Sequence, residues 1–509
     1  MIIPRPTALT PHPGEFVIPP ALHLSAGEGA ERAAGLLTAY LGPDRPRVAY
    51  GPRVRLSLGE PDLPRQGYAL RIDPGEVVLT APAEEGLFHG VQTLRQLLPP
   101  AALDPRTAPP DVWRWPCATV RDAPRLPWRG VMLDVARHHM PPEFLHEFVD
   151  QIALHKFNVL HLHLTDDQGW RIEIEDLPRL TEVGAWRAES MVGPAGSTRF
   201  DGTPHGGYYT CRTLRDLVAY AEHRGVTIVP EIEMPGHTRA ALAAYPHLGN
   251  DPEVTRPVWS SWGVSEDILG VHDEALEFCR TVLARTAEVF PSRYVHIGGE
   301  ECPTTQWETS PAARRRAASL GLTDTAQLHG WFLSQMQDTL AEHGRRAICW
   351  DEAERNGELP ADMTLTAWRD PAHGVRSVRR GHQVIMAPYR STYFDYAQSD
   401  RPGEPAGQPD LVTTLEDVYR FDPLAGDAPI ADPLDGRRPG VLGTQAQLWT
   451  EFAPTPDHVR YLAYPRLCAL AEAAWSEGTR DYEEFRDRLA AHIERLRVLG
   501  ALAARGVMV

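Results

Sequence analysis

The chain has 509 residues, of which 68 are acidic and 51 are basic, and its formal net charge is −17. A chain of this length is too long for one small core, so we expect two or three domains, with room for one as large as a barrel. The excess of acidic residues argues against a nucleic-acid-binding protein, because neutralising phosphates requires clustered Lys and Arg. A neutral or cationic small substrate fits this charge better.

The N-terminal sequence MIIPRPTALTPHPGEF has prolines where a secretory signal requires an unbroken apolar core. No later segment has the roughly 18 apolar residues of a membrane span. We therefore expect a cytoplasmic protein without membrane partners, or a secreted one if a leader was removed. The cysteines lie singly, without Cys-x-x-Cys spacing, and predict buried free thiols in place of disulfides or a zinc site. The six are Cys117, Cys211, Cys279, Cys302, Cys349 and Cys468.

Residues 1–123 have the pattern of a small α/β domain. The short apolar runs RVRLSL and EVVLTAP are strand-like, and GLFHGVQTLRQLL is helix-like. The segment LDPRTAPPDVWRWP is rich in Pro and Asp and marks the way out of the domain.

Residues 124–509 repeat a different pattern, in which apolar runs that end in polar residues alternate with longer helical or loop segments. Parallel strands buried on both faces give continuous apolar runs, and eight such units predict a (β/α)8 TIM barrel. A doubly wound open sheet has the same local pattern, and the count of eight favours the barrel. The runs are RGVMLD, NVLHLHL, VTIVPEIE, YVHIGG, RAICWDE, LTAWR, HQVIMAP and GVLGTQAQLWTE.

The segments between these runs include two clear helices and three long insertions. PEFLHEFVDQIALH carries Phe144, Phe148 and Ile152 on one side, and TAQLHGWFLSQMQDTLAEHG ends at a glycine. The stretches rich in Gly, Pro and Asp are longer than ordinary connectors, and in a barrel such insertions usually build the rim of the active site. They span 166–212, 249–272 and 396–440.

Polar and aromatic residues close all eight runs, at the place where barrel enzymes keep their catalytic groups. Charges crowded in one mouth repel one another, which suggests that they have a function. Trp and Tyr among carboxylates suit a sugar, because aromatic faces stack on its C–H side while charged groups hold its hydroxyls. The residues are Asp134, Arg137, Asp166, Asp167, Glu231, Glu233, His237, Glu300, Glu301, Trp350, Asp351, Glu352, Trp368, Tyr393, Asp395, Trp449 and Glu451.

Two adjacent acids stand out in the stretch HIGGEECPTTQW, directly after the fourth run. Repulsion between neighbouring carboxyl groups raises the pKa of one of them, and a carboxyl that stays protonated near neutral pH can act as a general acid. Cleavage of a glycosidic bond requires such an acid at the leaving oxygen.

The motif HIGGEECP resembles the His-x-Gly-Gly-Asp-Glu signature of glycoside hydrolase family 20, the β-N-acetylhexosaminidases. Five further blocks are similar to that family's motifs in the same order, and the N-terminal domain is similar to the one that usually precedes its barrel. The blocks are RGVMLDVARH, NVLHLHLTDDQGWRIEI, EIEMPGH, LWTE and YPRLCALAEAAWS.

This resemblance implies hydrolysis of terminal, non-reducing β-linked N-acetylglucosamine or N-acetylgalactosamine, without a cofactor or metal. The expected partner is an oligosaccharide that ends in such a sugar. The mechanism of the family is retaining and substrate-assisted, so the oxygen of the 2-acetamido group attacks the anomeric carbon and an oxazolinium intermediate forms. Exo action is expected from a pocket closed at the far side of the sugar.

The resemblance also implies catalytic roles. Glu301 would protonate the leaving oxygen and then activate water, and Glu300 would accept the acetamide N–H and stabilise the oxazolinium. Asp166 and His237 would position the acid. The family usually has Asp where this chain has Glu300, and the longer side chain moves the carboxylate by about a bond length, which matters where geometry is tight.

Further residues are implied in substrate binding. Arg137 would hold the sugar hydroxyls far from the scissile bond, with Glu451 beside it, and Tyr393 would donate to the acetamide oxygen near Asp395. A further Trp that family members often carry after Asp395 has no clear counterpart in TTLEDVYRFDP. Three tryptophans would wall the pocket, namely Trp350, Trp368 and Trp449.

Two other classes of protein remain open at this stage. His161 and His163 lie two apart on a strand, so with His237 and Asp166 they could outline a metal site of a barrel hydrolase. Glu300 in place of Asp also allows a sugar-binding protein that has lost catalysis. The choice between N-acetylglucosamine and N-acetylgalactosamine and the oligomeric state are not predicted.

Overall fold

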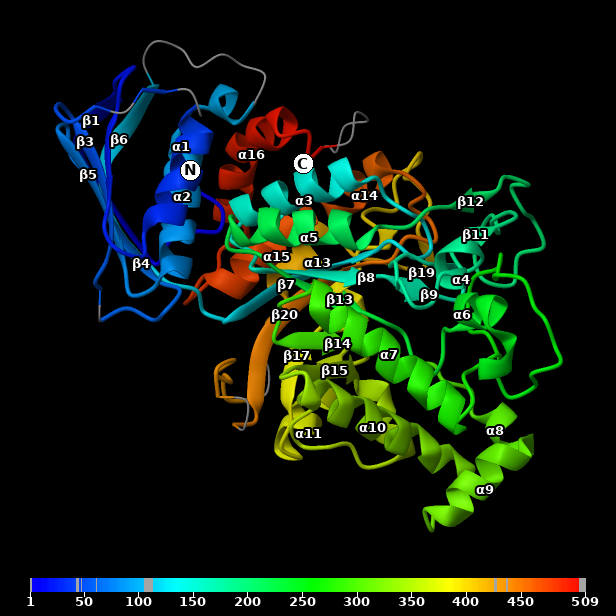
Figure 1. Ribbon diagram of the computed structural model, residues 1–509. Helices are drawn as coiled ribbons and strands as arrows, with labels where there is room; N and C mark the ends of the chain where they lie inside the picture. Colours follow the sequence, from blue (N-terminus) through cyan, green and yellow to red (C-terminus); the bar gives the residue numbers. More distant parts are fainter. Residues whose placement is uncertain are drawn as a thin grey trace.

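A six-stranded sheet with two helices on one face forms the N-terminal part of the computed structural model (Figure 1). The structure describes residues 2–42, 45–46, 48–60, 62–104, 113–424, 428–435 and 438–502. The strand order is β1-β6-β4-β5-β3-β2, and both helices lie between the sheet and the rest of the chain. The elements are β1 (Ala8–Ile18), β2 (His23–Ala26), α1 (Glu31–Leu41), β3 (Arg53–Leu58), β4 (Tyr68–Ile72), β5 (Glu76–Ala81), α2 (Glu84–Leu97) and β6 (Trp113–Asp122).

The elements predicted in this part of the chain are present. The two apolar runs are β3 and β5, and the helical pattern is α2, whose Leu87, Val91 and Leu94 are buried against the sheet. The segment predicted to lead out of the domain lies largely outside the described residues, which omit 105–112. The boundary at residue 123 stays a prediction.

Eight parallel strands close into a barrel in the order β13-β14-β15-β16-β17-β20-β7-β8. Each of the eight predicted runs overlaps one of these strands, so the predicted (β/α)8 barrel is confirmed and the open sheet is excluded. The strands are β7 (Trp128–Asp134), β8 (Val159–His163), β13 (Thr227–Glu231), β14 (Tyr294–His296), β15 (Arg346–Trp350), β16 (Thr364–Ala367), β17 (Gln383–Met386) and β20 (Gly440–Leu448).

Amphipathic helices surround the barrel. The predicted helix after the first strand is α3 (Pro142–Leu154), which buries Phe144, Phe148 and Ile152, and the second predicted helix forms over Leu328–Glu342 as α10. The other helices are α4 (Arg179–Glu182), α5 (Cys211–Glu222), α6 (Arg239–Ala244), α7 (Asp273–Val289), α8 (Thr305–Thr309), α9 (Pro311–Ser319), α11 (Pro371–Arg379), α12 (Tyr389–Thr392), α13 (Leu415–Arg420), α14 (Pro456–Ala463), α15 (Arg466–Trp475) and α16 (Tyr482–Val498).

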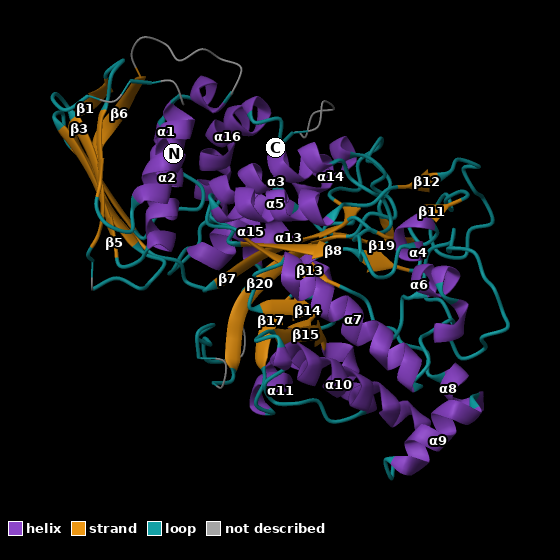
Figure 2. Cartoon of the chain, in the orientation of Figure 1, coloured by secondary structure: helices purple, strands orange, loops and turns teal. Residues whose placement is uncertain are grey.

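Most of the three long insertions lies at the carboxyl ends of the barrel strands, on the side away from the N-terminal sheet. The end of the third insertion is an exception, because the carbonyls of Asp432 and Pro433 accept hydrogen bonds from Gln383 and Arg293 at the amino ends of β17 and β14. Figure 2 shows the carboxyl end of the barrel as a cluster of loops that carries short strands. Catalytic groups of barrels lie at this end. The short strands are β9 (Thr165–Asp166), β10 (Gly169–Trp170), β11 (Trp186–Arg187), β12 (His205–Gly206), β18 (Tyr396–Ala397) and β19 (Gln408–Val412).

A buried ion pair joins the N-terminal sheet to the barrel. Lys156, which follows α3, places its Nζ 2.8 Å from Asp122 Oδ2 and 3.1 Å from the hydroxyl of Tyr68. Trp475 Nε1 donates to Asp122 Oδ1 over 2.9 Å. Because a buried charge without its partner is strongly destabilising, this contact fixes the sheet against the barrel.

All six cysteines are free, as predicted, and four of them are buried while Cys211 and Cys302 are partly exposed. No helix within the described residues is long and apolar enough to cross a membrane.

Candidate active site

A pocket of about 250 Å³ opens at the carboxyl ends of the barrel strands. Ten of the eleven residues predicted for the site line it, and the eleventh, Asp166, lies behind two of them. The ten are Arg137, His237, Glu300, Glu301, Trp350, Trp368, Tyr393, Asp395, Trp449 and Glu451.

The turn after β7 sets the position of Arg137. Asp134, the last residue of the strand, accepts hydrogen bonds from the backbone N–H groups of Ala136 over 2.8 Å and of Arg137 over 3.0 Å. The same carboxylate accepts from the backbone N–H of Thr450, two residues after β20, over 3.1 Å. One buried side chain thus joins the ends of two neighbouring strands under the pocket.

The guanidinium of Arg137 is held from several sides. Its Nη2 lies 2.8 Å from Asp166 Oδ2, its Nε donates to Gln168 Oε1 over 3.0 Å, and it lies over the ring of Trp449 at 4.9 Å. Burial alone would lower the pKa of Arg137, but Asp166 and Glu451 raise it well above its usual value. Arg137 therefore stays charged in a preorganised position, which suits the recognition of hydroxyl groups.

The two glycines of HIGGEE allow both acids to reach the pocket. Gly298 and Gly299 follow β14 with φ of 64° and 93°, a region that favours glycine, and Glu301 has a φ of 44°. A Cβ on Gly298 would lie 1.7 Å from Glu233 Oε2, so no larger residue fits there. The resulting turn buries Glu300, which is 8% exposed, and leaves the side chain of Glu301 42% exposed.

His237 connects Glu301 to two buried aspartates. Its Nε2 lies 3.5 Å from Glu301 Oε2, and its Nδ1 lies 3.3 Å from Asp166 Oδ1 and 3.1 Å from Asp167 Oδ2. Burial alone would lower the pKa of His237, but Asp166 raises it well above its usual value. The imidazole is therefore protonated at neutral pH and donates towards Glu301.

The pKa values of the adjacent acids correct one expectation from the sequence. The raised pKa belongs to Glu300, and its main cause is burial, with Glu231 adding to it, so repulsion from the adjacent Glu301 is not the main cause. Burial alone would also raise the pKa of Glu301, but the hydrogen bond from His237 outweighs it and holds this pKa below its usual value. Glu301 is thus an accessible carboxylate next to a cationic imidazole.

Replacing His237 by Gln is expected to lower kcat about 10- to 100-fold, because a hydrogen bond to a charged group contributes about 1.5–3 kcal/mol and about 1.4 kcal/mol is tenfold. Since His237 holds the pKa of Glu301 down, its removal should raise that pKa. Because His237 no longer stores the proton that the leaving oxygen needs, the alkaline limb of the pH–rate profile should nevertheless move to lower pH. Steady-state rates from pH 4 to 9 would check this, with His223→Gln on the exposed end of α5 as control. An unchanged profile in H237Q would contradict the contact.

Aromatic side chains wall the pocket. The rings of Trp350 and Trp449 lie 5.9 Å apart, and those of Trp368 and Tyr393 are stacked at 6.2 Å. Trp350 is fixed by its Nε1, which donates to Glu231 Oε1 over 2.9 Å. Such walls fit the C–H face of a sugar ring or the methyl group of an acetamide.

Several polar atoms around the pocket are buried and have no hydrogen-bond partner in the part of the chain that the structure describes. They include Trp368 Nε1, Asp395 Oδ1 and Glu451 Oε2. Burial raises the pKa of Asp395 well above its usual value and that of Glu451 above its own. Unpaired buried polar atoms are costly, so a ligand rich in hydroxyl and amide groups suits this pocket.

The structure adds residues that the sequence analysis did not name. Trp262, Ala195 and Gln408 line the pocket, and each comes from one of the three long insertions expected at the rim. Gln408 Nε2 donates to Glu451 Oε1 over 3.4 Å. The length of these insertions was a signal that they reach the site, but no periodic pattern shows which of their residues does.

The histidines considered as metal ligands surround Glu231 in the barrel interior. His161 Nε2 lies 3.1 Å from Glu231 Oε2, while His163 lies between Glu231 at 2.5 Å and Asp166 at 2.9 Å. Burial alone would lower the pKa of His163, but Glu231 and Asp166 raise it to about 10. His163 is therefore a cation in this site, and its two nitrogens donate to Glu231 and Asp166.

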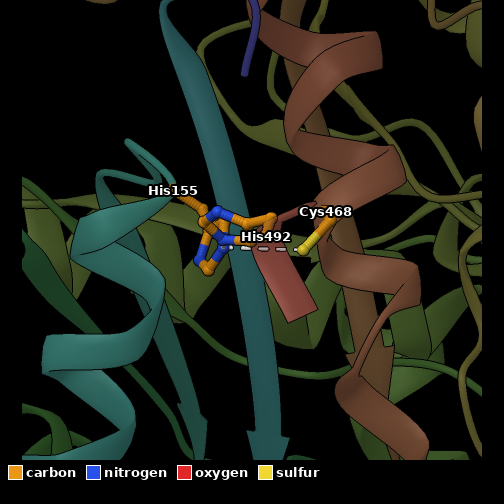
Figure 3. A group of neighbouring side chains, drawn as sticks. All are labelled: His155, Cys468 and His492. Carbon is orange, nitrogen blue, oxygen red and sulfur yellow. Dashed lines mark hydrogen bonds between the residues drawn. The ribbon is translucent and has the colours of Figure 1, made fainter. Parts of the chain in front are cut away.

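A second group of close donor atoms lies away from the pocket, where three helices meet (Figure 3). His155 follows α3, Cys468 is on α15 and His492 is on α16. The two Nε2 atoms are 3.0 Å apart, and Cys468 Sγ lies 3.5 Å from His155 Nε2. Burial lowers the pKa of His155 to about 4, so its ring is neutral and Nε2 accepts while Nδ1 bonds to the carbonyl of Gln151. We assign this group to helix packing.

A barrel whose mouth combines two adjacent carboxyl groups, a preorganised arginine and aromatic walls has the architecture of a glycoside hydrolase. Two family descriptions match the chain: the catalytic domain of glycosyl hydrolase family 20 over residues 126–478 and domain 2 of the same family over residues 1–123. The chain therefore belongs to glycosyl hydrolase family 20, which confirms the resemblance found in the sequence.

Curated relatives of the chain are named β-hexosaminidases. The β-hexosaminidase of Porphyromonas gingivalis is 39% identical over 447 residues, which are 86% of this chain and 54% of that protein. The β-hexosaminidase of Vibrio furnissii is 35% identical over 476 residues, which are 92% of this chain and 76% of that protein. The chain thus spans about half the length of the first relative and about three quarters of the second.

Solved structures of this family share the whole fold. The GH20 exo β-N-acetylglucosaminidase from Vibrio harveyi, in complex with N-acetylglucosamine, aligns with a TM-score of 0.86 at 32% identity and covers 98% of this chain and 77% of its own. The N-acetyl-β-hexosaminidase of Streptomyces plicatus, in complex with Thio-NAglucal, has a TM-score of 0.83 at 33% identity and covers 99% and 96%.

Proposed function

We propose that the chain is an exo-acting β-N-acetylhexosaminidase that releases terminal non-reducing N-acetylglucosamine or N-acetylgalactosamine, for example from chitooligosaccharides. The observation that carries this proposal is the pairing of an accessible carboxylate, Glu301, with a buried carboxyl, Glu300, on one pocket walled by Trp residues. The names of the relatives and the sugar bound to the Vibrio harveyi enzyme support the same substrate class.

The reaction is retaining and assisted by the substrate. The acetamide oxygen attacks the anomeric carbon, the glycosidic C–O bond breaks, and the leaving oxygen takes a proton from Glu301. Glu300 accepts the acetamide N–H and balances the positive charge of the oxazolinium. Water then attacks the anomeric carbon and gives its proton to Glu301, and the bond to the acetamide oxygen breaks, so the configuration is retained.

His237 supplies the proton that Glu301 needs. The pair holds one proton at neutral pH, and in the empty pocket that proton lies on His237. A bound sugar covers Glu301, and loss of water disfavours its charged form. The proton then moves towards Glu301, which can act as the general acid.

The far end of the pocket determines which end of an oligosaccharide can be cleaved. Arg137 and Glu451 both line the pocket, and we expect them to hold the hydroxyl groups distant from the scissile bond and to leave no room for a chain that continues beyond them. We therefore expect cleavage only at non-reducing ends. Internal cleavage of a chitin oligomer with a blocked non-reducing end would contradict exo action.

The first test compares two aryl glycosides with the wild-type protein. We expect hydrolysis of 4-nitrophenyl N-acetyl-β-glucosaminide and at least about 10³-fold slower hydrolysis of 4-nitrophenyl β-glucoside, because the second lacks the intramolecular nucleophile. Equal rates would indicate a carboxylate nucleophile of the protein. Binding without turnover of either glycoside would favour a sugar-binding protein.

A further inference from the structure

Glu300 has a second buried carboxyl group as its neighbour. Glu233, two residues after β13, is 1% exposed, and its carboxyl group lies within hydrogen-bonding reach of the carboxyl group of Glu300. No N–H or O–H group within the described parts of the chain donates to either oxygen of Glu233 or to Oε2 of Glu300. Two carboxylates cannot donate to each other, so this contact requires a proton on one of them.

The surrounding backbone holds Glu233 in this place. Its N–H donates to Thr165 Oγ1 over 2.9 Å, and its Oε2 occupies the space that a side chain at Gly298 would need. The glycine at 298 therefore has two effects: it makes the turn that brings Glu300 to the pocket, and it leaves room for the carboxyl group behind Glu300.

The charges around the pair favour a proton on Glu233. Burial raises the pKa of Glu233 well above its usual value, and the carboxyl groups of Glu300 and Glu231 add to this effect. The cations on the other side are His237, which favours the charged forms of both carboxyls, and His163, whose Nδ1 is 3.9 Å from Glu233 Oε1. Asp166 contributes a further negative charge.

We propose that Glu233 is a positioning residue that acts as a neutral carboxylic acid and donates a hydrogen bond to Glu300 Oε2. This bond holds the long side chain of Glu300 in one rotamer, so that its other oxygen faces the acetamide N–H of the bound sugar. Glu233 does not line the pocket, so it acts through Glu300 without touching the substrate. The inference rests on the proposed function of Glu300.

The bond also lowers the pKa of Glu300, since a donor stabilises the carboxylate form. It partly offsets the burial that raises this pKa. Glu233 thus gives the site two properties, a fixed direction of the carboxylate and a larger fraction of its charged form. Glutamine can reproduce both, because its amide donates a hydrogen bond and has nearly the same shape, whereas leucine can reproduce neither.

The test compares Glu233→Gln with Glu233→Leu on 4-nitrophenyl N-acetyl-β-glucosaminide. We expect E233Q to keep kcat within about threefold and E233L to lose about 10- to 50-fold in kcat with a smaller change in KM, since leucine removes the hydrogen bond to the charged form of Glu300. Glu28→Gln and Glu28→Leu, on an exposed side chain of the N-terminal domain, are the matched controls.

The pH profile separates this role from a merely structural one. In E233L the limb that reports Glu300 should move to higher pH, because Glu300 loses its donor, while E233Q should keep the wild-type profile. A shift to lower pH in either variant would mean that Glu233 is ionised and would overturn the proposal, as would equal losses in E233Q and E233L. If E233L does not fold, the profile of E233Q still decides. A wild-type protein that does not require the acetamido group would instead refute the proposed function.

Discussion

Replacing Glu301 by Gln is expected to lower kcat for N,N′-diacetylchitobiose by about 10²- to 10⁴-fold, the usual contribution of a general acid. The sugar leaving group of this substrate is a poor one and has to be protonated as the glycosidic bond breaks. Glu301 is the accessible carboxyl of the pocket, and Gln keeps its size while it cannot deliver a proton. The measurement is kcat for wild type and E301Q, with Glu28→Gln as control.

The size of the loss in E301Q should depend on the leaving group of the substrate. With 4-nitrophenyl N-acetyl-β-glucosaminide the leaving phenolate needs little protonation, so formation of the oxazolinium should slow by about tenfold or less. Its breakdown still needs Glu301 as a base, so the slow step should change to the attack of water. The rate of the nitrophenol burst measures the first step on the aryl glycoside. If E301Q slows this burst as much as it lowers kcat for N,N′-diacetylchitobiose, Glu301 is not the general acid.

The composition of the site could be predicted because a parallel barrel brings all its strand ends together. Once eight apolar runs are recognised, residues far apart in the chain, such as Arg137, Trp350 and Glu451, must meet at one mouth. That geometric rule explains why ten of the predicted residues line the pocket. The rule does not extend to the insertions, because the path of a long loop depends on its tertiary contacts, and Trp262 and Gln408 were therefore missed.

Protonation could not be predicted from spacing along the chain. Glu300 and Glu301 are adjacent, but the turn at Gly298 and Gly299 sends one into the interior and the other towards solvent. Burial then raises the pKa of Glu300, and contact with His237 lowers that of Glu301. Both causes depend on parts of the chain that are distant in sequence. The two adjacent acids therefore predicted that one pKa is raised, but not that it is the pKa of Glu300, nor that burial is the cause.

Replacing Glu300 by Ala is expected to lower kcat for 4-nitrophenyl N-acetyl-β-glucosaminide by about 10²- to 10³-fold, the effect of losing one preorganised electrostatic contact to the transition state. Unlike the loss of Glu301, this loss should not depend on the leaving group, because the acetamide has to attack in every case. Comparing E300A with wild type on the aryl glycoside and on N,N′-diacetylchitobiose measures this. Retention of more than about a tenth of wild-type kcat on both would contradict the role of Glu300.

The replacement Glu300→Asp separates charge from position. Aspartate keeps the carboxylate but draws it back by about a bond length, and a misplacement of about 1 Å can cost about 10²-fold. The shorter side chain also leaves Glu233 without its partner, so we expect E300D to lose about tenfold or more in kcat even though Asp is the residue usual for the family. Recovery of full activity would show that the pocket adapts around the shorter side chain.

Replacing Glu300 by Ala should raise the thermal stability of the protein at neutral pH although it lowers the activity. The pKa of Glu300 is raised in the folded state, so the protein binds this proton more tightly when folded than when unfolded. When the pH is above the pKa that Glu300 has in the unfolded chain, burying this carboxyl therefore lowers the free energy of unfolding. The loss disappears as the pH falls below the pKa of Glu300 in the unfolded chain. E300A should consequently have a Tm at pH 7 equal to or higher than that of the wild type, less any effect of the cavity left by the shorter side chain. The fold thus keeps the carboxyl of Glu300 although it lowers stability. Its role in catalysis explains this, because the oxazolinium supplies a positive charge beside the carboxylate only during the reaction.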